Sequence, residues 1–101
     1  MQGASTSAAP EYRKDMPGQL ILTNRQILKE EVMADLEDGK RNFLFDFKGT
    51  LHIDPSGMGV LVSLRKEIEK RNGSLHLANL NEHLRTQFRL TKLDQLFRIV
   101  N

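Results

Sequence analysis

Two kinds of hydrophobic spacing alternate along this chain, and the alternation limits the folds open to it. Residues 42–48, NFLFDFK, carry phenylalanine at every second position, the period of a strand with one face in the core. Residues 74–80, SLHLANL, repeat that period. Residues 25–39 and 57–73 instead carry apolar side chains three and four apart, as amphipathic helices do. Strands alternating with helices of this length predict an α/β fold with a mainly parallel sheet.

Shorter segments complete the pattern at both ends. Residues 20–22, LIL, predict a buried strand before the first helix. Residues 81–90 predict a helix capped by its first residue, Asn81, and residues 91–101 predict a short helix that ends in an apolar tail. The phenylalanines mark residues 42–48 as a central strand. With so few strands, we expect the helices to cover one face of the sheet more than the other.

Residues 1–17 differ in composition from the rest and are predicted to be a flexible tail. Small and turn-forming residues fill positions 3–10, and only Tyr12 and Met16 offer much surface to bury. The apolar surface that such a segment can bury is too small to offset the conformational entropy that it loses on ordering. We therefore place the folded domain at residues 18–101. The alternative is that Tyr12 to Met16 supply an irregular edge of the sheet.

Composition excludes several classes of function. The 101 residues are 39% hydrophobic and 28% charged, which fits one globular domain. Cysteine is absent, so disulfides, thiolate nucleophiles and cysteine-based zinc sites are excluded. The net charge of +2 is not the excess that marks a nucleic-acid binder. No apolar run approaches about 18 residues, and no signal-peptide core is visible, so we expect a cytoplasmic protein without a membrane span.

The most informative segment is IDPSGMGV, residues 53–60, where a loop meets the second long helix. Asp54 can cap that helix and Pro55 suits its first position, so capping alone would explain both residues. Two glycines then stand in the first turns, where each weakens a helix by up to ~1 kcal/mol relative to alanine. Gly57 and Gly59 leave the backbone uncovered, so another molecule could approach Ser56 closely.

The hydroxyl of Ser56 is also a plausible carrier of a phosphate group. Free N–H groups and the positive end of the helix dipole stabilise a dianion at this position. A phosphate adds about −1.5 to −2 charges at pH 7 and would repel an acidic or apolar partner. The capping interpretation and the phosphate interpretation both remain open from the residues alone.

Other site types fit the chain poorly. A nucleophile elbow needs glycine where Asp54 stands, and the segment has no P-loop lysine. The histidines, His52, His76 and His83, are too scattered to predict a metal site or a catalytic triad. Basic residues in positions 65–71 interleave with glutamates, which is typical of a solvated helix face. We therefore predict no catalytic residue, no metal and no nucleic-acid partner.

Taken together, residues 44–97 resemble the STAS domain of bacterial anti-sigma factor antagonists. The similarity rests on the strand with its aspartate, IDPSGMGV at a helix start, a basic helix ending in Gly73, and the terminal LDQLF. It extends back without gaps to Gly18 and covers about four-fifths of the chain. The resemblance implies a small α/β domain with a mainly parallel mixed sheet flanked by helices.

The resemblance also implies a phosphorylation-controlled partner switch without enzymatic activity or a cofactor. Unphosphorylated protein would bind a serine kinase of the histidine-kinase-like ATPase fold that is also the anti-sigma factor. Phosphorylation of Ser56 would release the kinase, a PP2C-type phosphatase would reset the switch, and ATP would belong to the kinase. The surface expected to bind the partner comprises Asp54, Pro55, Ser56, Gly57, Met58 and Gly59.

Each residue of this surface has an expected role. Asp54 orients the loop and the acceptor hydroxyl, Gly57 and Gly59 permit close approach, and Met58 is the exposed apolar anchor. The chain departs from the family pattern in three ways. Pro55 replaces the family's first serine, GQLI at residues 18–21 lacks the family's aspartate, and the N-terminal strand region is shortened. Pro55 and the shortened N-terminal region leave an alternative open. The alternative is a STAS scaffold module that is not phosphorylated and docks within a transport, stress or secretion-regulating assembly.

Overall fold

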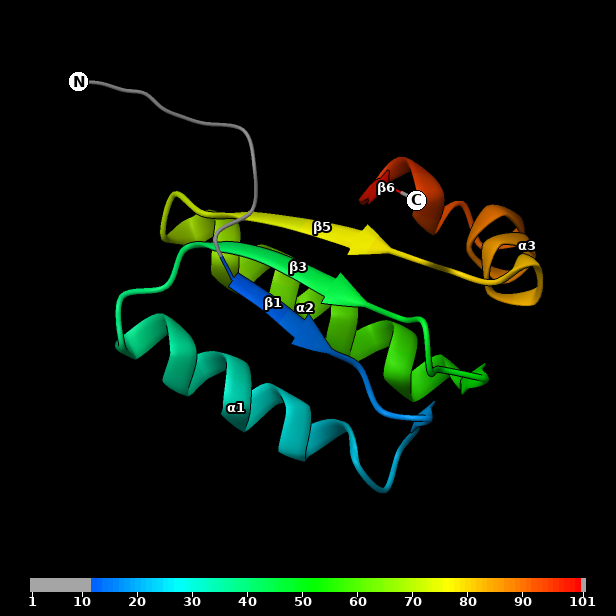
Figure 1. Ribbon diagram of the computed structural model, residues 1–101, viewed down its shortest axis with the longest axis horizontal. Coiled ribbons are helices and arrows are strands. Elements are labelled where there is room, and N and C mark those ends of the chain that lie inside the picture. Colours follow the sequence, from blue (N-terminus) through cyan, green and yellow to red (C-terminus); the bar gives the residue numbers. More distant parts are fainter. Residues whose placement is uncertain (1–11, 101) are drawn as a thin grey trace.

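The computed structural model describes residues 12–100 and contains a four-stranded parallel sheet. Its strands lie in the order β1 (Tyr12–Asp15), β3 (Asn42–Asp46), β5 (Ser74–Ala78) and β6 (Arg98–Val100). The prediction of an α/β fold with a mainly parallel sheet is confirmed, and β3 occupies the central place expected for the phenylalanine-rich strand (Figure 1).

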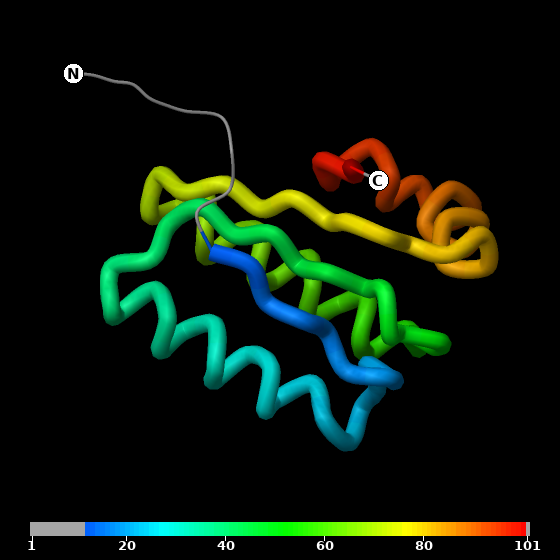
Figure 2. Tube along the Cα trace, in the orientation of Figure 1, coloured from blue at the N-terminus to red at the C-terminus, as the bar shows by residue number. Residues whose placement is uncertain are grey.

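Helices α1 (Arg25–Glu37) and α2 (Pro55–Lys70) lie side by side against one face of this sheet (Figure 1). Both helices begin at the end of the sheet where the strands finish, as the Cα trace shows (Figure 2). Helix α3 (Glu82–Leu90) and the 3₁₀ turn η2 (Leu93–Gln95) pack together near the same end. The helices thus cover one face of the sheet more than the other, as expected.

The core lies between the sheet and the two long helices. Phe43 and Phe45 are fully buried, with their ring centroids 6.1 Å apart in an edge-to-face arrangement. The stripes predicted for the helices point into the same core and contain Leu28, Val32 and Leu36 of α1, Leu61, Leu64 and Ile68 of α2, and Leu84 and Phe88 of α3.

The predicted tail is wrong for residues 12–17, because β1 pairs in register with β3. Lys14 Nζ lies 3.1 Å from the Glu31 carboxylate and 3.7 Å from that of Asp35, both on α1. Met16 is only 5% exposed. Strand β1 lies at the edge of the sheet and has β3 as its neighbour. The hydrogen bonds to β3 and the ion pairs with α1 order this segment, although it has little apolar surface. Residues 1–11 of the predicted tail lie outside the described residues.

A second, two-stranded parallel sheet joins β2 (Gln19–Leu20) to β4 (His52–Ile53). The predicted strand at residues 20–22 is therefore shorter than expected, and Leu22 is 60% exposed. The segment that contains β4 was expected to be loop throughout. Two residues are too few for a visible period, so only the pairing of β2 with β4 reveals this sheet. Strand β4 ends at Ile53, and Asp54 alone separates it from Pro55, the first residue of α2.

Candidate functional site

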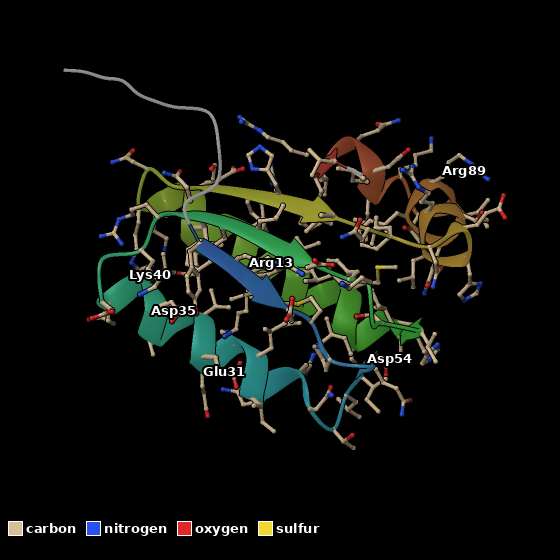
Figure 3. All side chains as sticks on the ribbon, in the orientation of Figure 1. Arg13, Glu31, Asp35, Lys40, Asp54 and Arg89 are labelled. Carbon is tan, nitrogen blue, oxygen red and sulfur yellow. The ribbon has the colours of Figure 1, made fainter. Side chains whose placement is uncertain are left out.

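The carboxylate of Asp54 holds the junction between β4 and α2 together, as expected for a capping residue. Its Oδ1 accepts a hydrogen bond of 2.7 Å from the backbone N–H of Gly57, within the first turn of α2. Its Oδ2 accepts a second, of 3.1 Å, from the backbone N–H of Leu22, which follows β2. Figure 3 shows Asp54 where α2 begins, beside the segment that leads from β2 to α1. One side chain therefore ties the two segments together.

These contacts keep Asp54 ionised. The hydrogen bond from the Gly57 amide is the largest cause that lowers the pKa of Asp54, and the amides of Leu22 and Ser56 act in the same direction. Burial opposes them but does not reverse the shift. The carboxylate thus presents a fixed negative charge beside Ser56.

The lowered pKa of Asp54 makes part of the stability dependent on pH. Because the folded pKa lies below the unfolded one, the contribution is complete above the ordinary value of about 3.9 and is lost as pH falls through the folded pKa. We expect Asp54→Asn to melt below wild type at pH 7, with a smaller difference at pH 3. Circular dichroism melting at both pH values measures this. Asp94→Asn, at an exposed residue of η2, is the control, and an unchanged Asp54→Asn difference at pH 3 would contradict the assignment.

The two glycines of the segment serve different purposes. A Cβ on Gly57 would lie 2.2 Å from the carbonyl oxygen of Leu20, so this glycine lets α2 pack on the backbone of β2. Its predicted role in partner approach is therefore wrong, because the close approach is made within the molecule. Gly59 is exposed, and a Cβ there would meet nothing within 4 Å. Only Gly59 leaves an open surface of the expected kind.

Met58 is not the exposed anchor that the sequence suggested. It is 7% exposed and belongs to the hydrophobic core. Met58 lies three residues before Leu61, so the two side chains share the inward side of α2. Met58 therefore extends the buried stripe instead of facing a partner.

Side chains from α3 and its cap hold the loop before Ser56, a role that the sequence did not reveal. Gln87 Nε2 donates a 2.6 Å hydrogen bond to the carbonyl of Ile53, next to Asp54. Asn81, whose Oδ1 caps α3 as predicted, also donates through Nδ2 to the carbonyl of Thr50. No periodicity or motif marks a glutamine for this task, since its partner lies 34 positions away.

Ser56 itself is half-buried in the first turn of α2, and its neighbour Pro55 is exposed. Two exposed leucines belong to the segments that lead to this junction. Leu22, whose N–H is bonded to Asp54, is 60% exposed, and Leu51, which precedes β4, is 74% exposed. A serine hydroxyl at a helix start, an open glycine and unburied leucines together form a surface suited to contact with another protein.

Comparison with known proteins agrees with this architecture. The family model of the STAS domain matches residues 15–101. The chain belongs to the STAS domain family. This STAS domain is 29% identical over 89 residues to the anti-sigma-B factor antagonist of Bacillus subtilis, an alignment that covers 88% of this chain and 81% of the relative.

Solved structures share the fold of this STAS domain. A candidate anti-sigma factor antagonist from Thermotoga maritima superposes with a TM-score of 0.78 at 27% identity, covering 85% of this chain and 75% of that one. A sulfate transporter family protein from Wolinella succinogenes gives 0.77 at 19% identity, covering 87% and 74%, and at that identity shows the fold alone.

The histidines of the STAS domain do not form a metal site within the part of the chain that the structure describes. Among residues 12–100, no group of three or more acidic or histidine side chains gathers where it could hold a metal ion. His76 is half-buried, and its burial, together with the charge of Arg98, lowers the pKa of the imidazole. Within the same described range, no helix is both long enough and apolar enough to cross a membrane.

Proposed function

We propose that this STAS domain is an anti-sigma factor antagonist whose partner binding is switched off by phosphorylation of Ser56. The observation that carries the proposal is the position of Ser56, half-exposed in the first turn of α2 between exposed Pro55 and open Gly59. The antagonist relatives support the role, and the cap at Asp54 supports a rigid presentation of the hydroxyl.

The partner in this proposal is a serine kinase of the histidine-kinase-like ATPase fold that also acts as the anti-sigma factor. The unphosphorylated STAS domain binds this kinase and so frees the sigma factor. The kinase transfers a phosphate from its own ATP to Ser56 and is released. A PP2C-type phosphatase removes the phosphate and restores binding. Because the reaction consumes ATP, the proposal places the switch in the cytoplasm.

The geometry explains how a phosphate could change binding without unfolding the domain. Ser56 is not part of the core, so a phosphate on its hydroxyl can extend into solvent. The amides at the start of α2 and the helix dipole favour its negative charge. The ionised Asp54 stands beside it, so the phosphorylated surface becomes strongly acidic.

The test is intact mass with site mapping after incubation with ATP and the candidate kinase. We expect one added phosphate on Ser56 in wild type, none in Ser56→Ala, and one in the control Thr91→Ala, which alters an exposed hydroxyl residue that follows α3. No addition, with a kinase shown to be active on another substrate, would overturn the switch and favour the unphosphorylated scaffold. Binding without modification would point to a constitutive antagonist in which Pro55 blocks transfer.

A further inference from the structure

A hollow of about 220 Å³ lies between α1 and α2, close to Ser56. Its lining, called here the basic hollow, consists of Arg25, Gln26 and Lys29 on α1 and of Gly59, Val60 and Ser63 on α2. Gly59 and Val60 follow Ser56 by three and four positions, so they share its side of the helix. The hollow is therefore continuous with the surface around the serine.

The cations of the basic hollow have no acidic counterpart. Among residues 12–100, no carboxylate forms an ion pair with Arg25 or Lys29, although Lys29 is half-buried. The other end of the groove between the helices is different. There Arg71 lies 2.9 Å from the Glu67 carboxylate and 4.0 Å from that of Glu37. Within the described residues, the cations at the end of the groove next to Ser56 therefore lack the direct ion pairs that Arg71 makes at the other end.

The placement of Arg25 is unfavourable for α1 itself. It is the first residue of the helix, where the dipole favours acidic side chains, and the first turn of α1 contains none. A residue that destabilises its own helix is expected at positions where that residue serves binding. Exposed apolar side chains flank this arginine, with Leu22 at 60% and Ile27 at 59% exposure. Charge and apolar surface thus occur together, as in protein interfaces.

We propose that the basic hollow receives acidic side chains of the kinase partner, with Leu22 and Ile27 packing against apolar side chains around them. This inference rests on the proposed function and specifies the chemistry of its partner surface. It also gives a physical cause for release. A phosphate on Ser56 brings about two negative charges to the edge of the basic hollow, so it neutralises the cations that attract the partner.

The test compares charge reversal inside and outside the basic hollow. R25E/K29E changes the net charge by −4, and the matched control R89E/R98E makes the same change at exposed residues of α3 and β6. Figure 3 shows Arg89 on α3, away from α1. Binding of each protein to the kinase identified by the phosphorylation experiment is measured by calorimetry at low and at high salt. R25E gives α1 an acid in its first turn, so loss of fold is not expected.

We expect R25E/K29E to weaken binding by about 10-fold or more at low salt and to flatten its salt dependence, with the control within about 2-fold of wild type. Equal losses in both variants would show an effect of net charge alone and overturn the inference. Wild-type affinity that does not fall with salt would also overturn it. If wild type binds and R25E/K29E binds as tightly, only the basic hollow is refuted. If wild type does not bind the kinase, the proposed function fails and this inference fails with it.

Discussion

Gly57→Ala is expected to melt far below wild type, because its new Cβ would lie 2.2 Å from the Leu20 carbonyl oxygen and 2.9 Å from the carbonyl carbon. Both atoms belong to the backbone of β2, which cannot turn aside as a flexible side chain could. Either α2 moves away from β2 or the small β2–β4 sheet opens. Overpacking of this kind costs roughly 3 kcal/mol, which corresponds to about 10–20 °C in a domain of this size. Circular dichroism melting measures the shift.

Gly59→Ala is the matched control, with the same change in side chain two residues further along α2. A Cβ at Gly59 meets no atom within 4 Å, and alanine is the better helix former by up to about 1 kcal/mol. Its melting temperature should therefore equal or slightly exceed that of wild type. Equal behaviour of the two variants would contradict the close packing of α2 on β2. Loss of kinase binding by a fully folded Gly59→Ala would support partner approach at this position.

The sequence predicted the regular elements well where a long period was present. Helix α1 shows its stripe at Leu28, Val32 and Leu36, and β3 shows alternation across Phe43 and Phe45, so the burial of these residues followed from their spacing. The N-cap at Asp54 was also predicted from the sequence, because the geometry of an N-cap depends on a few consecutive residues. Local rules were sufficient wherever the interacting groups were close in sequence.

The errors arose where the decisive partner was distant in sequence. Strand β1 contains few apolar residues, and its ladder with β3 and the ion pairs of Lys14 with α1 become visible only in the fold. The same holds for Gly57, whose neighbour is the carbonyl of Leu20, and for Gln87, which holds Ile53. Spacing along the sequence therefore did not separate the buried residues at the start of α2, Gly57 and Met58, from the exposed residues Pro55 and Gly59.

Ser56→Asp is expected to weaken binding to the kinase by about 10-fold or more, while Ser56→Ala binds as wild type does and stays bound when ATP is added. Aspartate places one negative charge at the start of α2, where phosphoserine would place about two, so its effect should be smaller than that of the phosphate. The alanine variant keeps the surface but lacks the acceptor oxygen. Because Ser56 is half-exposed and outside the core, both variants should fold. Calorimetric titration with the kinase, with and without ATP, measures the two affinities.

Asn72→Asp is the control for charge, because it adds one negative charge at an exposed position just beyond the end of α2 that lies away from Ser56. It should bind within about 2-fold of wild type, since a distant surface charge is screened at physiological salt. If Ser56→Asp and Ser56→Ala both bound as wild type does, the surface at Ser56 could not act as a switch. If Ser56→Ala alone lost binding, the hydroxyl would be a direct contact of the partner rather than a phosphate acceptor. If Ser56→Asp alone loses binding to the kinase, negative charge at position 56 controls the release of the partner.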